Sequence, residues 1–164
     1  MEINRNMLAC RRFALLGIAL ILAGCAASGE SFKDSVAQTR AVSPGKALVY
    51  VYREASIYGS GDLFDLYAND HLVSRMTNGG YFDIEVDPGQ VALRVHEVVI
   101  PIQIVTHIIN NVSLDARPLY TLQAKAGQTY YVKFKLDIPD FTMTPVSKDE
   151  AVTAMSGMKR FDRT

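Results

Sequence analysis

The chain has 164 residues, and its 17 basic and 17 acidic side chains give a formal net charge of zero. This balance excludes the strongly basic surface through which proteins bind the phosphates of nucleic acid. With 49% hydrophobic residues, the chain is long enough to build one domain around a single core.

The first 24 residues have the three-part layout of a secretory signal peptide. Arg5, Arg11 and Arg12 precede an apolar run over residues 13–22, and two small residues follow it. The apolar run is too short to cross a hydrocarbon core about 30 Å thick, which requires roughly 20 helical residues. We therefore predict that residues 1–24 are cleaved, and a retained transmembrane helix is the weaker interpretation.

The residues Leu22-Ala23-Gly24-Cys25 resemble the lipobox of a bacterial lipoprotein. The resemblance implies cleavage before Cys25 and acylation of this cysteine on its sulfur and its new amino group. Three acyl chains would hold the protein on the bilayer permanently, whereas one chain binds only marginally. Because Ala26 follows instead of an aspartate, the resemblance also implies a location in the cell envelope, on the outer membrane and facing the periplasm.

Residues 25–45 are rich in small and polar side chains, which predicts a lipidated flexible tether with a mean span of roughly 25 Å. Cleavage removes three arginines and one glutamate, so the mature chain has a net charge of about −2. Cys10 leaves with the signal peptide and Cys25 carries the lipid. The mature domain therefore has no thiol for a disulfide, a redox reaction or a metal.

Between residues 46 and 146, short alternating apolar segments follow one another at regular spacing and are separated by turn residues. This pattern predicts a β-sandwich domain. The expected strands cover residues 47–53, 62–68, 72–76, 81–86, 90–97, 119–124, 129–136 and 141–145.

The turns between these segments predict three antiparallel hairpins. Around residues 69–71, an odd-numbered loop places Phe64 opposite Met76 inside and Asp65 opposite Arg75 outside. A two-residue loop at Pro88-Gly89 would pair the flanking strands in the same manner, with Ile84 opposite Leu93 inside and Asp83 opposite Arg94 outside.

The third hairpin turns at residues 125–127. A three-residue loop places Leu122 opposite Tyr130 and puts Gly127 in the left-handed position of a bulged turn. Two antiparallel sheets built from these hairpins would stack face to face. The expected fold is an all-β, Ig-like or transthyretin-like sandwich of about 7–8 strands.

Residues 98–109 are nearly all apolar and contain Pro101. One interpretation is a buried edge strand that bends at the proline. The other is an exposed apolar flap that meets a partner or the membrane. The sequence leaves both open.

Residues 147–164 should form a short helix and a tail. Ser147 and Glu150 have the spacing of a capping box, which marks the start of a helix. Gly157 provides a stop signal. We expect this helix to cover one end or edge of the sandwich.

The search for chemistry yields no catalytic, metal-binding or cofactor motif. His96-Glu97 begins like a zinc-protease motif, but Ile100 stands where the second histidine would be. We therefore do not expect an enzyme.

One candidate ligand surface consists of basic and aromatic residues that alternate on two expected strands: Arg94, His96, Tyr131, Lys133 and Lys135. Such residues can bind a sugar or an acidic partner. The alternative is an ordinary solvated face that Asp83 and Glu85 balance in charge.

Several segments in order along the chain are similar to an uncharacterised family of bacterial lipoproteins. These segments are Leu48-Val49-Tyr50-Val51-Tyr52-Arg53, Asn78-Gly79-Gly80-Tyr81-Phe82, Asp87-Pro88-Gly89 and Ala126-Gly127-Gln128-Thr129-Tyr130-Tyr131. The resemblance implies one small β-sandwich domain of unknown function without catalytic residues. The stretch from Pro88 to Leu93 is also similar to PEGA-type surface domains.

The expected function is therefore that of a membrane-anchored envelope lipoprotein without enzymatic activity, whose domain has a structural role or binds an envelope protein. The alternative is a module that binds a glycan or another envelope ligand. Beyond the lipid at Cys25, no cofactor, metal or nucleic acid is expected.

Overall fold

The computed structural model describes residues 27–33, 40–98, 118–137 and 140–161. Within these ranges the chain forms strands β1 (Ala47–Arg53), β2 (Leu63–Ala68), β3 (His71–Met76), β4 (Gly80–Val86), β5 (Gly89–Val98), β6 (Tyr120–Ala124), β7 (Thr129–Asp137), β8 (Asp140–Pro145) and β9 (Lys159–Arg160), and helix α3 (Lys148–Met155). The first eight strands agree with the expected ones to within one residue at each end. The short strand β9 was not predicted.

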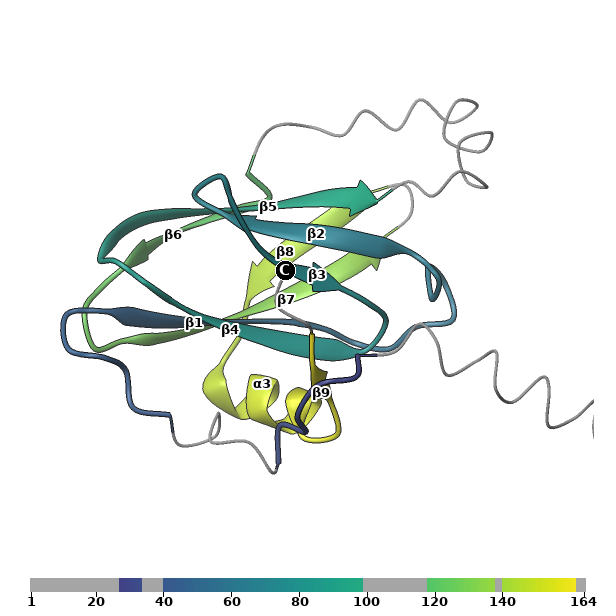
Figure 1. Cartoon of the computed structure of the whole chain (residues 1–164), viewed down its shortest axis with the longest axis horizontal. Coiled ribbons are helices and arrows are strands. Elements are labelled where there is room, and N and C mark those ends of the chain that lie inside the picture. The colour runs from purple at the N-terminus through teal and green to yellow at the C-terminus, as the bar shows by residue number, and fades with distance from the viewer. Residues whose placement is uncertain (1–26, 34–39, 99–117, 138–139, 162–164) are drawn as a thin grey trace, which may run out of the picture.

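The strands form two sheets that pack face to face (Figure 1). One sheet has the order β8-β7-β1-β4-β9 and the other the order β3-β2-β5-β6. The prediction of an all-β sandwich with a short C-terminal helix is confirmed. The larger sheet is mixed, because β7 and β9 run parallel to their neighbours β1 and β4.

The hairpin between β2 and β3 is the one that the sequence predicted correctly. Phe64 lies opposite Met76 and Asp65 opposite Arg75, and the last pair forms an ion pair with 2.7 Å between Nε and Oδ1. The turn itself has two residues with positive φ, as a type I′ turn requires. The register shifts between Leu66 and Tyr67, where Val73 of β3 is left without a partner, and this extra residue reconciles a two-residue turn with the predicted pairing of Phe64 with Met76.

The predicted hairpin between β4 and β5 is wrong. β4 pairs with β1 and β9, whereas β5 pairs with β2 and β6 in the other sheet. Asp83 therefore forms ion pairs with Arg40 and Arg160 instead of Arg94. Two consecutive strands can form a hairpin in one sheet or lie in opposite sheets. In both cases their apolar side chains face the same core, so the alternation of apolar and polar residues could not distinguish the two arrangements.

The predicted hairpin between β6 and β7 is wrong for the same reason. β6 pairs with β5, and Leu122 lies opposite Val91. β7 lies in the other sheet, where Tyr130 pairs with Val49 of β1. Gly127 does adopt the expected left-handed conformation, with a φ of 76°. The turn was recognised correctly, but it connects two sheets.

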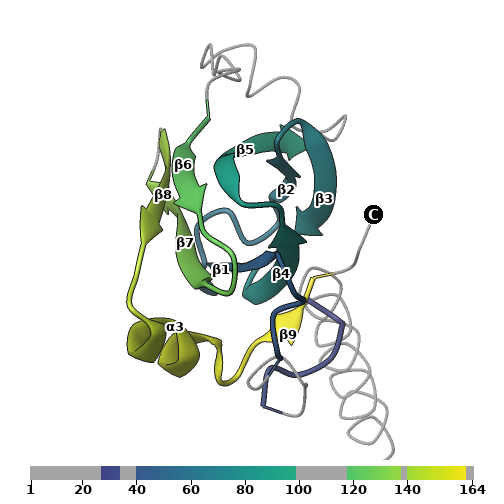
Figure 2. The ribbon, with the colours of Figure 1, turned by 90° about the vertical axis from the view of Figure 1, so that its left-hand side faces the viewer.

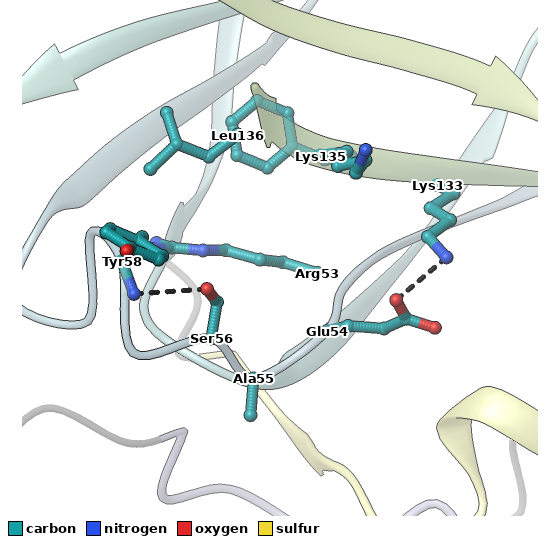
Figure 3. Close-up of a pocket in the computed structure, with 9 residues that line it drawn as sticks. Arg53, Glu54, Ala55, Ser56, Tyr58, Lys133, Lys135 and Leu136 are labelled. Atoms are coloured by element: carbon teal, nitrogen blue, oxygen red, sulfur yellow. Dashed lines mark hydrogen bonds and ion pairs between the residues drawn. The ribbon is translucent and has the colours of Figure 1, made fainter. Parts of the chain in front are cut away.

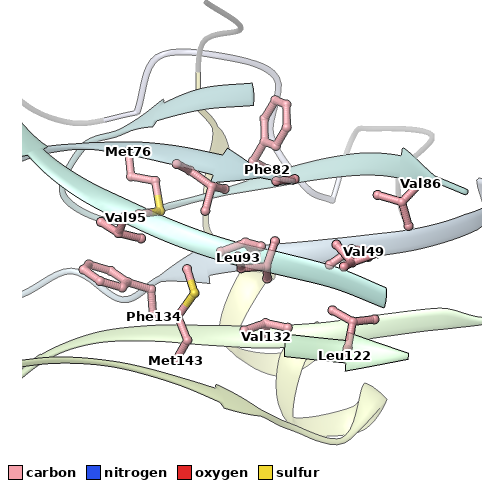
Figure 4. Close-up of a cluster of buried hydrophobic side chains, with 14 of the residues drawn as sticks. Val49, Met76, Phe82, Val86, Leu93, Val95, Leu122, Val132, Phe134 and Met143 are labelled. Atoms are coloured by element: carbon pink, nitrogen blue, oxygen red, sulfur yellow. The ribbon is translucent and has the colours of Figure 1, made fainter. Parts of the chain in front are cut away.

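The main core fills the space between the sheets (Figure 4). It is built from the inward residues of both sheets, including Val49, Leu93, Leu122, Val132 and Phe134. The alternation of buried and exposed positions along β2, which reads half-buried, buried, half-buried, shows the period of two that predicted the strands.

A second cluster covers the outer face of the larger sheet, so β1 is buried along its whole length. Helix α3 lies over this face rather than at an end of the sandwich, which corrects the expected position (Figure 2). Ala151 and Met155 of the helix pack with Phe32, Tyr50 and other residues of the cluster. The helix begins as predicted, because the Ser147 hydroxyl accepts a hydrogen bond from the Glu150 amide at 3.2 Å.

The prediction of a flexible tether over residues 25–45 is wrong for residues 27–33. Ala27 and Phe32 are buried, with exposed fractions of 8% and 1%. Backbone hydrogen bonds join this segment to the end of the chain, from Gly29 N to Arg160 O and from Arg160 N to Glu30 O. The polar composition of this segment concealed the contact, which is made by backbone hydrogen bonds and by the single large apolar side chain of Phe32.

Two further predictions fall largely outside the described residues. In the segment 98–109, only Val98 is described, where it ends β5 opposite Leu63. The predicted signal peptide and Cys25 also lie outside the described residues. Among the described residues, no helix has the length and apolar character needed to cross a membrane.

Candidate functional site: a pocket at the end of β1

A pocket of about 240 Å³ opens at one end of the sandwich, where β1 ends and the β1–β2 loop begins. Its walls come from residues 53–56, Tyr58 and residues 133–136, so β7 forms the opposite side (Figure 3). A shallower hollow of about 320 Å³ adjoins it and shares Ser56, Tyr58 and Leu136. The pocket is smaller than the roughly 300–1,000 Å³ of typical sites for drug-sized ligands, so it suits a single sugar or a comparable group.

Arg53 forms the floor of this region. Its side chain is only 3% exposed, and it donates hydrogen bonds to the carbonyl oxygens of Asp62 at 2.9 Å and Gly59 at 2.5 Å. The guanidinium also lies 4.9 Å from the ring centre of Phe64. Burial lowers the pKa of Arg53, and Asp62 opposes this shift. The buried cation is therefore used to hold the β1–β2 loop.

A second clamp holds the other side of the loop. The side-chain amide of Asn78 accepts from Ser56 N and donates to Ser56 O, both at 2.9 Å. Gly59 has a φ of 66°, and a Cβ there would lie 2.2 Å from Leu136 Cδ2. A larger residue would strain the backbone and would also require the side chains of Leu136 and Asp62 to move. The loop is thus fixed at both sides.

The braced loop presents two large apolar side chains to solvent. Ile57 is 93% exposed and Tyr58 is 75% exposed. Such exposure is uncommon for adjacent large hydrophobic residues and is typical of a contact surface.

The charges at the rim of the pocket are paired. Lys133 Nζ lies 2.8 Å from Glu54 Oε2, and Lys135 Nζ lies 2.5 Å from Asp137 Oδ1. Lys135 keeps much of its surface, since its side chain is 61% exposed. A ligand anion would therefore meet donors that already have acidic neighbours, which favours a polar or weakly acidic group over a multiply charged one.

The structure divides the five candidate residues between two opposite faces. Lys133 and Lys135 line the pocket, and Tyr131 is on the same outward face of β7. Arg94 and His96 lie on the outward face of β5, in the other sheet. The prediction that the five share one surface is therefore wrong, because the β5 and β7 sheets expose their outer faces in opposite directions.

The residues outside the pocket have local partners. Tyr131 stacks on Tyr50 with 5.3 Å between ring centres and packs against the cluster under α3, and burial raises its pKa. Arg94 forms an ion pair with Asp70. His96 makes an edge contact with Tyr67 at 5.6 Å. These contacts account for the three residues as parts of the fold.

Sequence reasoning missed Arg53, Ile57, Tyr58 and Asn78. An arginine at the end of an otherwise apolar strand was a usable signal for Arg53, since a buried cation requires partners. The hydrogen bonds of Asn78 depend on the approach of two loops, and no local sequence pattern indicates them. Within the described ranges, no three His, Cys, Asp or Glu residues gather where they could hold a metal ion.

These features define a small two-sheet β-sandwich domain with a helix over one outer face and a shallow pocket at one end. A family model described as a protein of unknown function, DUF2846, matches residues 43–146. The chain belongs to this family. The match runs from just before β1 to just after β8, so residues 27–33, α3 and β9 lie beyond it. No curated protein and no solved structure matches the chain.

Proposed function

We propose that this protein is a lipoprotein of the cell envelope, anchored through acylated Cys25, whose sandwich acts by binding and not by catalysis. The supporting observation is the position of the lipobox-like segment Leu22-Ala23-Gly24-Cys25. It follows a basic and then an apolar segment, and it ends two residues before Ala27, where the described domain begins. Signal, acylation site and domain thus follow one another in the order that an anchored module requires.

The anchor can be tested by metabolic labelling with an alkyne analogue of palmitate. The wild-type chain should incorporate the label and fractionate with the outer membrane, and Cys25→Ala should lose both properties. Cys10→Ala is the matched control, because this cysteine lies within the proposed signal peptide and should leave the labelling unchanged. Label that persists in Cys25→Ala would disprove the anchor.

For the domain itself, the first candidate role is binding of an envelope protein. Capture of the acylated protein from membranes, beside the soluble Cys25→Ala form, tests it. Partners recovered with the wild type but lost when residues 98–109 are made polar would support this role. Equal recovery of partners by the wild type and by the variant with a polar segment 98–109 would contradict it.

The pocket at the end of β1 favours a second candidate, a module that binds a sugar-sized envelope ligand. Tyr58 offers an aromatic face, and Ser56 and Lys135 offer hydrogen-bonding groups. Nuclear magnetic resonance titration with soluble cell-wall glycan fragments should shift resonances of these residues. Lys135→Ala should weaken the shifts, whereas His96→Ala on the opposite face should not. Shifts confined to the His96 face would contradict this role.

A further inference from the structure

The start of the described chain and the exposed loop lie at the same end of the sandwich (Figure 1). Gly80 of β4 pairs with Arg53 of β1, and a Cβ on Gly80 would lie 2.6 Å from the Ala27 side chain. A Cβ on Gly79 would lie 3.0 Å from that of Ala55, at the beginning of the β1–β2 loop. An unbroken series of contacts therefore connects Ala27 to the loop.

The distance between the proposed anchor and this end of the domain is short. Cys25 and Ala27 are two residues apart, so their Cα atoms are separated by at most ~7 Å. A flexible tether of twenty residues would have allowed roughly 25 Å. Because residues 27–33 are hydrogen-bonded to the domain, an acylated Cys25 must hold the end that contains Ala27 at the membrane surface.

The loop at this end has the composition of a membrane-contact element. Ile57 and Tyr58 are 93% and 75% exposed, and tyrosine is enriched at the level of the lipid headgroups because its ring is apolar and its hydroxyl polar. Arg53 and Asn78 fix the loop, so its backbone need not be ordered when the two side chains enter the interface.

We propose that this end of the sandwich docks on the phospholipid bilayer through Ile57 and Tyr58, an inference that rests on the proposed lipid anchor at Cys25. The acyl chains hold the domain at the surface, and the loop fixes its orientation. The pocket then opens beside the membrane, with Lys135 near the headgroups.

The charges beside the loop indicate whether the membrane contact is electrostatic or apolar. Lys133 and Lys135 each pair with an acidic neighbour, Glu54 and Asp137. Attraction to anionic lipids is therefore weak, and insertion of apolar side chains provides the contact. We expect docking on neutral phosphatidylcholine vesicles and no decrease in high salt.

Fluorescence quenching can test the orientation, since the chain contains no tryptophan. The full-length acylated protein would be reconstituted into phosphatidylcholine vesicles with or without brominated acyl chains. Tyr58→Trp should lose at least half of its emission in brominated vesicles. Leu72→Trp is the matched control, because Leu72 is 40% exposed at the β2–β3 turn, at the opposite end of the sandwich, and its emission should stay unchanged.

Flotation on a density gradient separates failure of the anchor from failure of the docking. Protein that floats with the vesicles but shows equal, weak quenching at both positions would overturn the docking and leave the anchor intact. Protein that does not float would overturn the anchor and the docking together. In the Tyr58→Trp background, Ile57→Asp should reduce quenching at least twofold, and Leu72→Asp should not; equal effects would also overturn the docking.

Discussion

The Arg53 guanidinium donates a hydrogen bond to the carbonyl oxygen of Gly59 at 2.5 Å and so ties the end of β1 to the tip of the β1–β2 loop. Arg53→Met keeps much of the side-chain volume but leaves the carbonyl groups of Gly59 and Asp62 without this donor. Because an unsatisfied buried carbonyl costs about 1–3 kcal/mol, we expect a loss of stability of about 2 kcal/mol or more. Urea denaturation of the soluble Cys25→Ala form would measure it.

Arg75→Met is the control for this prediction. Arg75 forms a surface ion pair with Asp65, and its side chain is 44% exposed. Exposed pairs contribute about 1 kcal/mol or less, so this variant should unfold at nearly the wild-type urea concentration. Equal destabilisation by both substitutions would show that Arg53 does not brace the loop.

Gly59 gives the second prediction. Its φ is left-handed, at 66°, and a Cβ added to it would lie 2.2 Å from Leu136 Cδ2. Gly59→Ala should destabilise the domain by more than the roughly 1–2 kcal/mol that the left-handed conformation alone costs. Gly45→Ala measures that conformational cost, since Gly45 has a φ of 78° and no atom within 4 Å of an added Cβ. Thermal unfolding of both variants gives the difference.

A double variant isolates the contact itself. Leu136→Ala removes the nearest atom that the new Cβ would meet, and Asp62 Oδ2, at 2.7 Å, remains. In this background Gly59→Ala should cost less than it does in the wild type and approach the cost of Gly45→Ala. If the two effects of Gly59→Ala and Leu136→Ala simply add, the contact contributes nothing and the prediction is wrong.

The strands were predictable because alternation of apolar and polar residues is a local property. Sheet membership was not, because Phe82 and Val95 face the same core whether their strands pair or cross between the sheets. Turn conformation held the missing information. Asn69 and Asp70 both have positive φ and close a true hairpin, whereas a Pro-Gly turn does not match the twist of paired strands.

The candidate site was predictable only where it depended on one strand. Lys133 and Lys135 share a face of β7 by their spacing alone, and both line the pocket. Arg94 was grouped with them because it lies on the outward face of its own strand, a pattern that does not show which sheet that strand joins. Arg53 and Asn78 act through a loop whose path depends on long-range contacts, so the sequence pattern contained no sign of their roles.

Asp83 gives the third prediction. Its side chain is 2% exposed and lies between Arg40 and Arg160, with 2.7 Å from Oδ1 to the Arg160 guanidinium. Asp83→Asn would remove the counter-charge of Arg160, whereas Arg40 would keep Glu85, whose Oε1 lies 3.6 Å from its guanidinium. Because the arginines are partly exposed, we expect a loss of about 2 kcal/mol, below the ~3–5 kcal/mol of a fully buried pair.

Hydrogen exchange would show where this loss acts. The Gly29 amide donates to Arg160 O, so Asp83→Asn should speed its exchange, while the amides of β5 in the other sheet should change less. Asp70→Asn is the control, since Asp70 is 70% exposed in its pair with Arg94. Unchanged exchange at Gly29 would contradict a role of Asp83 in holding the N-terminal segment.

Tyr52 gives the last prediction, on alkaline stability. Burial, with Glu150 and Glu54, raises the pKa of Tyr52 from 10 to about 12. Between these values the folded state keeps a proton that the unfolded state releases, so stability must fall as the pH rises from 10 to 12. One such group contributes a slope of at most about 1.4 kcal/mol per pH unit.

Tyr52→Phe should reduce this slope, which urea midpoints measured between pH 9 and 11 would show. Burial also raises the pKa of Tyr50, so part of the slope should remain. Among the described residues the Tyr52 hydroxyl has no hydrogen-bond partner, and its removal should therefore change stability little at pH 7. An unchanged alkaline slope, or a large loss at neutral pH, would mean that the hydroxyl is ionised or hydrogen-bonded in the folded protein.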